Sequence, residues 1–349
     1  MTFVPDELVP LAPLTTMGVG GAARFFREVH DEATLREALA WADEHGAALR
    51  LLGGGSNVVV GDAGFDGLVL RLVSRGVRFE PFDADRVDVT ASAGEPWDEF
   101  VAACVERDLQ GLECLSGIPG HVGATPIQNV GAYGQDVAQT ITRVRVLDRE
   151  TKDARVLTNA ECRFAYRDSA LKSETPDRYV VLDVTFRLRR GAPPAVRYAE
   201  LTRHLEANAG TTPTLASVRE AVLGLRRKKS MLLDPADENV RSCGSFFTNP
   251  IVAAAVAKQV ARRAGDELMP SYPESDGRVK LAAAWLIEHS GFKKGMRSGP
   301  VGLSSRHALA IVSHEGARAT DVLDFAKHIQ LMVRARFGVQ LTPEPSLWV

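Results

Sequence analysis

Cysteine is scarce in this sequence, and its spacing excludes two classes of protein. The four cysteines among 349 residues form no C-x-x-C pair and no cluster with histidine. This pattern argues against a metal site and a disulfide framework, and it favours reduced thiols. Cys243 precedes a Gly-Ser pair and invites assignment as a nucleophile. We do not expect this role, because the sequence offers Cys243 no partner histidine.

Long apolar runs and a charge excess are also missing. No stretch approaches the ~20 apolar residues that cross a bilayer, and the first seven residues lack the basic and apolar parts of a secretory signal. The formal net charge of −2 gives no general attraction to nucleic acid or anionic membranes. These absences predict a cytoplasmic protein without nucleic-acid or membrane partners. Its length and 45% hydrophobic content are typical of about two or three globular domains.

The most informative segment that is present is a glycine-rich stretch at 115–134. Glycine recurs there at positions 117, 120, 123, 131 and 134, and Gln128 and Asn129 add adjacent amides. Glycine leaves the backbone open to close approach and to conformations that other residues avoid. The stretch therefore predicts a loop that lies against a large planar or phosphorylated ligand.

A second glycine loop, Gly53-Gly54-Gly55-Ser56-Asn57, follows a short apolar run. Successive amide N–H groups in such a turn can form an anion site, although a plain hairpin turn is equally compatible with the sequence. The loop is neither a Walker A motif nor a G-x-G-x-x-G fingerprint. Taken together, two glycine loops with polar amides favour a dinucleotide cofactor.

Hydrophobic periodicity predicts a mixed chain of helices and strands. Two interpretations of the basic run at 226–229 stay open, a favourable contact with a helix dipole or a phosphate contact. The prolines on both sides of Glu344 predict an extended tail. We expect helices over 31–42, 95–108, 213–229, 250–264, 279–289 and 320–337, and strands near 49–52, 57–60, 68–72, 86–91, 143–148, 154–158, 179–189 and 307–313.

Three further residues are of types that carry chemistry. Arg167 lies among apolar and aromatic neighbours, where its fixed charge needs an anionic partner, of which Asp168 is the simplest. Ser245 lies between a glycine and two phenylalanines. A serine that serves as a turn residue or a helix cap would also fit this position. Glu344 alone would pass for an exposed acid in the tail. Singly, each residue is better explained by a structural role.

The chain as a whole resembles the UDP-N-acetylenolpyruvoylglucosamine reductases, bacterial flavoenzymes of peptidoglycan precursor synthesis. Six motifs in the family's order carry the resemblance, and a match for the family's substrate tyrosine at Tyr198 indicates the longer subtype. The motifs are Thr16-Met17-Gly18-Val19-Gly20-Gly21, Gly53-Gly54-Gly55-Ser56-Asn57, 118–134, Tyr166-Arg167-Asp168-Ser169, 244–250 and 281–287.

The resemblance implies an α+β fold of three parts. A two-lobed domain of the vanillyl-alcohol-oxidase type would hold noncovalent FAD between its lobes, and a third domain would bind substrate. The first lobe would span 1–75 and be joined by the tail 343–349, the second lobe would span 76–240, and the substrate domain would span 241–342. A monomer is expected.

The resemblance also implies a reaction and the residues that serve it. NADPH reduces FAD, and flavin N5 then delivers hydride to the enolpyruvyl ether of UDP-N-acetylglucosamine enolpyruvate, giving UDP-N-acetylmuramate. Arg167 would hold the charge that develops at the substrate carboxylate, Ser245 would donate the proton, and Glu344 would orient the same carboxylate. The matching FAD contacts are Gly53, Gly54, Gly55, Ser56, Asn57, Ser116, Ile118, Gly120, Gly123, Ala124, Gln128, Asn129, Gly131 and Tyr133. The matching substrate contacts are Tyr198, Lys229, Asn249, Tyr272, Lys280 and His307.

Three departures from the family pattern and two rival hypotheses accompany this prediction. The stretch from Met231 to Arg241 is longer than the family's, which bears on Lys229, and His307 stands where the family often has another polar residue. His121 stands where the family usually has a small residue or a hydroxyl, so the local contact with the FAD pyrophosphate is open. Another FAD oxidoreductase of the same fold is one rival, although it would need a flavin-linking residue or a large aromatic lobe. The other is a noncatalytic nucleotide-sugar binding protein, against which the intact set of Arg167, Ser245 and Glu344 argues.

Overall fold

The structure is a computed structural model that describes residues 3–208, 212–265 and 269–349. These residues group into two compact units, each assembled from separate stretches of the chain. Unit 1 comprises Met1–Val9, Ala23–Gly54 and Asp66–Leu232, and unit 2 comprises Pro10–Ala22, Gly55–Phe65 and Leu233–Val349. The three-part division expected from the sequence stays a prediction.

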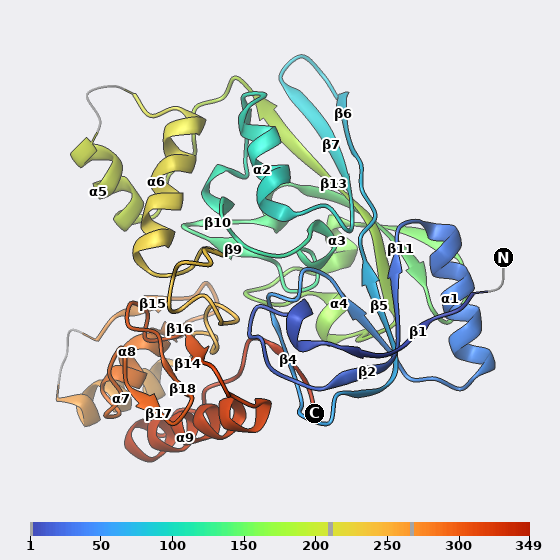
Figure 1. Cartoon of the computed structure of the whole chain (residues 1–349). Coiled ribbons are helices and arrows are strands. Elements are labelled where there is room, and N and C mark those ends of the chain that lie inside the picture. The colour runs from blue at the N-terminus through green and yellow to red at the C-terminus, as the bar shows by residue number, and fades with distance from the viewer. Residues whose placement is uncertain (1–2, 209–211, 266–268) are drawn as a thin grey trace. The chain divides into compact units, whose positions relative to one another are not determined.

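The N-terminal part of unit 1 is a small sheet covered by one helix. Its strands, in spatial order, are β1 (Asp6–Pro10), β2 (Ala22–Val29), β5 (Phe65–Leu72) and β3 (Leu49–Leu52), and its helix is α1 (Glu32–Glu44), all at the blue end of the colour scale in Figure 1. The carboxylate of Asp31 accepts the N–H of Thr34 at 2.7 Å and so caps α1. Because β3 runs parallel to β5, with Leu52 opposite Arg71, the loop after β3 emerges beside the end of β5.

A larger antiparallel sheet forms the centre of unit 1. Its order is β12 (Ala154–Thr158), β11 (Ile141–Asp148), β13 (Tyr179–Arg190), β7 (Arg86–Ser92) and β6 (Val77–Pro81), and β8 (Leu109–Gln110) also pairs with β13. Alternate residues of a strand point to opposite faces, so Val87 and Val89 of β7 face the core. There they join Trp97 and Phe100 of helix α2 (Trp97–Val105) in one buried cluster.

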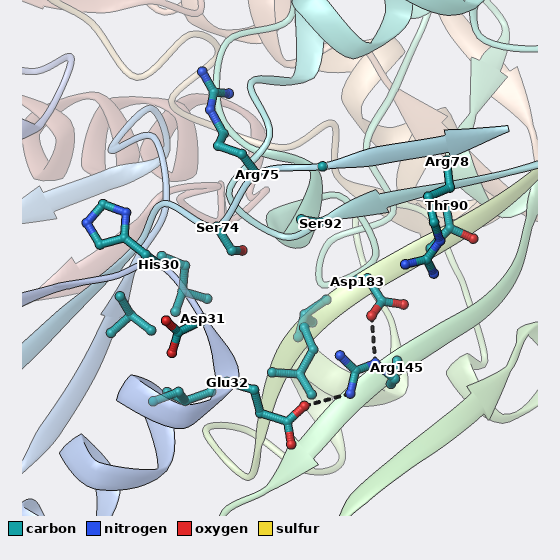
Figure 2. Close-up of a pocket in the computed structure, with 16 residues that line it drawn as sticks. His30, Asp31, Glu32, Ser74, Arg75, Arg78, Thr90, Ser92, Arg145 and Asp183 are labelled. Atoms are coloured by element: carbon teal, nitrogen blue, oxygen red, sulfur yellow. Dashed lines mark hydrogen bonds and ion pairs between the residues drawn. The ribbon is translucent and has the colours of Figure 1, made fainter.

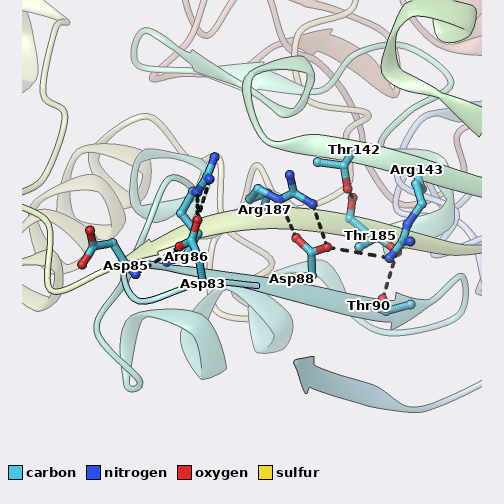
Figure 3. A network of polar contacts seen from close by, with 9 residues as sticks. All are labelled: Asp83, Asp85, Arg86, Asp88, Thr90, Thr142, Arg143, Thr185 and Arg187. Atoms are coloured by element: carbon cyan, nitrogen blue, oxygen red, sulfur yellow. Dashed lines mark hydrogen bonds and ion pairs between the residues drawn. The ribbon is translucent and has the colours of Figure 1, made fainter. Parts of the chain in front are cut away.

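The opposite face of the large sheet is polar although much of it is buried. Figure 3 shows Asp88 of β7 between two arginines of neighbouring strands: Arg187 bonds it through two nitrogens, at 2.7 and 2.9 Å, and Arg143 approaches to 3.7 Å. Thr90 of β7 and Thr185 of β13 share a hydrogen bond of 2.9 Å. These cross-strand pairs satisfy polar groups that burial would otherwise penalise.

Helices α5 and α6 also belong to unit 1, and the sequence predicted one of them. Helix α6 (Leu215–Lys228) begins two residues later than expected for a Thr212 cap, because Thr214 is the capping residue and forms a capping box with Ser217. Helix α5 (Ala199–Asn208) was not predicted, and it packs Leu201 and Leu205 against α6. The remaining short elements of unit 1 are β9 (Gly131–Ala132), β10 (Gln135–Asp136), α3 (Asn159–Cys162) and α4 (Ala170–Ser173).

In its described residues, unit 2 combines small sheets with three helices, which share one large buried cluster. The strands are β14 (Ile251–Ala253), β16 (Arg278–Leu281) and β15 (Ser271–Pro273) in one sheet, β17 (Arg297–Ser298), β18 (Val301–Leu303) and β19 (Ile311–Ser313) in a second, and β4 (Val58–Val60) with β20 (Ser346–Trp348) in a third. The helices are α7 (Ala254–Ala264), α8 (Ala283–Glu288) and α9 (Ala319–Phe337). Residues of all three helices pack with Phe246 and Phe247 in the core.

Two predicted helices of unit 2 were too long at their N-terminal ends. The residues before α7 and α8 are strands β14 and β16, which pair with each other so that Val252 lies opposite Val279. This pairing joins residues far apart in sequence, and helical periodicity does not detect it. The strand expected over 307–313 is likewise confined to 311–313. The extended tail is observed, with Pro343 bridged to Phe247 and Ser346 paired in parallel with Val58.

Two features sought along the chain are missing from its described part. No helix in residues 3–208, 212–265 or 269–349 is long and apolar enough to cross a membrane. The same residues contain no group of three or more His, Cys, Asp or Glu side chains placed to hold a metal ion.

A buried carboxylate leads to a stability prediction. Glu113 is 0% exposed and accepts hydrogen bonds from the amide of Gly111 at 2.8 Å, the side chain of Gln135 at 2.9 Å and the amide of Ala195 at 3.1 Å. Glu113→Ala leaves these donors without an acceptor, so we expect it to lower the free energy of unfolding by about 3 kcal/mol. Urea unfolding at a fixed FAD concentration measures the loss. Glu37→Ala, on an exposed position of α1, should change it by less than about 0.5 kcal/mol, and equal losses would contradict the prediction.

Candidate active site

The start of the first glycine loop, Gly53 and Gly54, meets the second glycine loop in unit 1. A Cβ atom on Gly54 would lie 2.7 Å from the Cα of Gly120 and 3.3 Å from Cδ2 of His121. The first distance is shorter than real Cβ contacts, so the two backbones approach as closely as only glycine permits. Loops separated by more than sixty residues in sequence therefore form one continuous backbone surface.

His121 links the second loop to the end of strand β5. Its Nδ1 lies 3.1 Å from the carbonyl oxygen of Leu72, and because a carbonyl can only accept, Nδ1 carries the proton. Burial lowers the pKa of His121 below its usual value, and the nearby charges of Arg71 and Arg75 add to this effect. We conclude that His121 is a neutral hydrogen-bond donor that fixes the loop.

The glycine at the start of the second loop is held from both sides. The amide of Gly117 donates to Asp98 at 2.5 Å, and its carbonyl accepts from Arg226 at 3.1 Å. Arg219 bonds both oxygens of Asp98, at 2.5 and 2.8 Å. Burial opposes ionisation of Asp98, but the bonds from Arg219 and Gly117 outweigh it, so its pKa lies below the usual value. Arg226 also donates to the carbonyl of Met231 at 2.7 Å, and these two backbone bonds indicate a structural role for this member of the basic run. Desolvation lowers the pKa of its guanidinium.

Arg167 lies against the second glycine loop. Its guanidinium donates to the carbonyl oxygen of Gly131 at 2.8 Å. Two neighbouring bonds fasten the same segments together, from the side-chain amide of Asn129 to Ala165 at 3.0 Å and from the hydroxyl of Ser169 to Ile127 at 2.5 Å. The structure thus brings a predicted catalytic residue to the loop predicted to hold the cofactor.

Three of these predicted residues have a strained backbone. The φ angles of Asn129, Tyr133 and Arg167 are 47°, 48° and 55°, in the left-handed region that residues with a side chain rarely adopt. Such conformations persist only where the surrounding structure enforces them, and they concentrate at functional sites.

A tyrosine pair and a lysine gather beside this loop. The rings of Tyr133 and Tyr198 meet edge to face, with centroids 5.5 Å apart. Lys229 places its Nζ 5.8 Å from the centroid of Tyr133 and 2.6 Å from a carboxylate oxygen of Glu200. Burial raises the pKa of Tyr133 to about 12, so its hydroxyl stays protonated. Residues predicted separately for cofactor and substrate are therefore neighbours in unit 1.

The remaining predicted cofactor contacts differ in exposure. Ser116 is buried and donates its hydroxyl to the carbonyl of Glu113 at 2.7 Å. Gly123 is held by its amide, which donates to Ala93 at 2.8 Å, whereas Ala124 is exposed. Partial burial is shared by Gly53, Ser56, Asn57, Ile118 and Gln128.

Ser245 and Glu344 lie on adjoining segments of unit 2. The amide of Glu344 donates to the carbonyl of Phe246 at 2.9 Å. The side-chain amide of Asn57 bonds the carbonyl of Glu344 at 3.4 Å, and the carbonyl of Asn57 accepts from Ser346 at 3.0 Å. Ser245 is half-buried, and within the described part of the chain its hydroxyl forms no hydrogen bond. The last residue of the first glycine loop thus fixes the tail that carries Glu344.

The other predicted substrate contacts of unit 2 lie in two places, at the β15–β16 pair with the start of α8 and in the loop before β19. Tyr272 lies directly opposite Lys280 across β15 and β16, and Asn249 accepts the amide of Ala283 at 2.9 Å at the start of α8. His307 accepts the amide of Leu309 through Nδ1 at 3.0 Å, which places its ring proton on Nε2.

Cys243 is a structural thiol, as expected. It is buried, its Sγ lies 3.4 Å from the carbonyl of Val58, and burial raises its pKa to about 12. A thiol that stays protonated at neutral pH is a poor nucleophile.

A cavity of about 260 Å³ opens between the two sheets of unit 1. Figure 2 shows Arg145 bonded to Glu32 at 2.7 Å and to Asp183 at 2.6 Å on its wall, with His30 on the far side. Leu72, whose carbonyl accepts the bond from His121, also lines it. Sequence analysis missed this site because its lining comes from several strands, one helix and their loops, and none of these carries a motif for it.

This architecture defines an FAD-binding oxidoreductase, and comparisons with known proteins agree. Residues 23–154 match the family described as "FAD binding domain". Residues 234–348 match the family described as "UDP-N-acetylenolpyruvoylglucosamine reductase, C-terminal domain".

Similarity over nearly the full length identifies the family. The chain is 50% identical over 345 residues to the UDP-N-acetylenolpyruvoylglucosamine reductase of Thermobifida fusca (strain YX), covering 97% of this chain and 96% of that protein. It is 44% identical over 348 residues to that of Pseudomonas aeruginosa, covering 100% of both. A crystal structure of the reductase from Thermus caldophilus matches with a TM-score of 0.66 at 26% identity, covering 99% of this chain and 100% of that one. The chain belongs to the UDP-N-acetylenolpyruvoylglucosamine reductase family.

The contact between the glycine loops gives a second prediction. Gly54→Ala drives a methyl group into Gly120, and an overpacked contact of this kind costs about 1–3 kcal/mol. We expect about tenfold weaker FAD binding, measured by flavin fluorescence during titration of the apoprotein. Gly224→Ala is the matched control, because it lies inside α6 with nothing within 4 Å, and it should raise stability by up to about 1 kcal/mol. Unchanged FAD affinity in Gly54→Ala would show that the loops can separate without consequence.

Proposed function

We propose that this chain uses NADPH and FAD to reduce the enolpyruvyl ether of UDP-N-acetylglucosamine enolpyruvate to UDP-N-acetylmuramate, a step of peptidoglycan precursor synthesis. The observation that carries the proposal is 50% identity, over 97% of the chain, to a reductase named for this substrate. The cytoplasmic location and the monomeric state stay predictions.

The residues of unit 1 fit a noncovalent FAD. Successive backbone amides of a glycine-rich loop such as 116–134 can bind a pyrophosphate, and the close contact of Gly54 with Gly120 holds that loop in place. Bound FAD supplies hydride transfer, and the chain supplies position and charge.

Arg167 is proposed to bind the substrate carboxylate. Negative charge grows on this group when hydride reaches the neighbouring methylene carbon. A guanidinium matches a carboxylate with two parallel hydrogen bonds, and its charge strengthens them as the charge develops. The bond from Arg167 to Gly131 and the enforced backbone at Arg167 fix its direction in advance, which is what electrostatic catalysis requires.

Ser245 is proposed to donate the proton that completes the reduction. A serine hydroxyl is a weak acid, so it can serve only a strongly basic carbon held in a fixed position. Its hydroxyl is not engaged by any described residue, which leaves it available to a substrate. Glu344, fastened by its amide to Phe246, is proposed to orient the carboxylate end of the same substrate.

Removal of the Ser245 hydroxyl should separate the two half-reactions. Ser245→Ala keeps the FAD-binding residues of unit 1, so anaerobic stopped-flow should show flavin reduction by NADPH within about twofold of wild type. Reoxidation by the enolpyruvyl sugar nucleotide should slow by about 10²–10⁴-fold, the usual effect of a general acid. Thr248→Val removes another hydroxyl of the same segment and should leave both rates unchanged.

The same experiment tests the rival hypotheses. A normal reoxidation rate in Ser245→Ala would remove Ser245 from the reaction. A wild-type flavoprotein whose FAD is reduced by an alcohol and not by NADPH would point to an oxidase. A colourless protein that consumes no NADPH in the presence of the enolpyruvyl sugar nucleotide would point to a binding protein.

Replacement of Arg167 by lysine should be damaging although charge is kept. The point charge of lysine cannot form the paired bonds of a guanidinium, so we expect Arg167→Lys to slow flavin reoxidation by about 10–100-fold with near-normal reduction by NADPH. Arg163→Lys is the control, because Arg163 has the same left-handed backbone and pairs with Glu174 on the surface. Comparable rates for the two variants would exclude Arg167 from the site.

A further inference from the structure

Lys229 already has an anionic partner in this structure. Its Nζ lies 2.6 Å from Oε2 of Glu200, and the two side chains are 32% and 34% exposed. The pair is therefore reachable from solvent and is not locked in the core. Tyr133 and Tyr198 adjoin it, so the pair belongs to the cluster beside the second glycine loop.

Each charge of the pair is also stabilised without the other. Glu200 lies in the first turn of helix α5, where the helix dipole favours an anion. Lys229 is the C-terminal cap of α6, whose last turn is basic, and a cation is favoured at that end. A ligand that separates the pair consequently leaves both groups in favourable positions, and the pair can open at modest cost.

The same arrangement recurs at a second predicted substrate lysine, in unit 2. Lys280 lies 2.7 Å from Glu274, with side chains 25% and 26% exposed, and Tyr272 is its direct neighbour across the sheet. In both places a lysine, a tyrosine and a partly exposed glutamate come together. The recurrence favours a common role for the two glutamates over a chance contact of Glu200.

We propose that Glu200 is a counter-ion that the diphosphate of the sugar nucleotide displaces from Lys229, and that it thereby sets the affinity of the site for diphosphates. The inference rests on the proposed function, in which Lys229 contacts the diphosphate. A diphosphate carries more negative charge than one carboxylate, so it competes successfully for the ammonium group. A ligand without phosphate does not, and Glu200 thus adds discrimination through competition.

Glu200→Gln tests this role, because glutamine keeps an acceptor for Lys229 while removing the charge. Titration calorimetry with the FAD-loaded enzyme should show UDP bound about threefold to fivefold more tightly than by wild type, in line with the strength of a partly exposed ion pair. Uridine should bind equally to both. Glu206→Gln, which removes the same charge from an exposed position of the same helix, should bind UDP as wild type does.

The same substitution made in a Lys229→Met variant tests whether the change in UDP affinity acts through Lys229. In the Lys229→Met background, Glu200→Gln should raise the affinity for UDP by less than about 1.5-fold, because the ammonium group for which Glu200 and the diphosphate compete is absent. Unchanged or weaker UDP binding by Glu200→Gln would overturn the inference and make Glu200 a residue that positions Lys229. Failure of the wild-type enzyme to bind UDP would instead overturn the proposed function and the inference with it.

Discussion

The approach of Gly54 to Gly120 is the constraint on which the rest of unit 1 depends. A backbone contact that leaves no room for a methyl group fixes where β3 must end and where the second loop must pass. The parallel pairing of β3 with β5 delivers the first loop, and His121 fastens the second loop to the end of the same β5 strand. The positions of both glycine loops are thus fixed by contacts with strand β5.

Buried charge is used in unit 1 to hold loops as well as strands. Asp98, Arg219 and Arg226 secure both backbone groups of Gly117, and Glu113 secures three donors from separate segments. A loop rich in glycine loses more conformational freedom on folding than other segments do. Multiple charge-assisted bonds offset that cost, which explains why each of these carboxylates accepts bonds from several donors. The Lys229–Glu200 pair is partly exposed and, among the described residues, bonds no backbone group of the glycine loops, so a ligand can separate it without releasing a loop.

Local patterns in the sequence predicted most of the elements and identified the motif residues as candidates. The alternation of β7 and β13, the amphipathic faces of α1 and α6, and the prolines around Glu344 each act within a few residues, so their strands, helices and extended tail follow from sequence. The resemblance to the reductases likewise rests on contiguous motifs. It named Arg167, Ser245 and Glu344 as candidates, and their roles remain to be tested.

Only the tertiary structure decided which distant segments meet. Strands β14 and β16 replaced the ends of two expected helices because their pairing partners lie about thirty residues apart. The neutral state of His121, the cavity between the sheets and the Glu200 partner of Lys229 all arise from contacts across the chain. Sequence periodicity records which face of an element is buried, whereas it carries no information on what that face or its loops will touch.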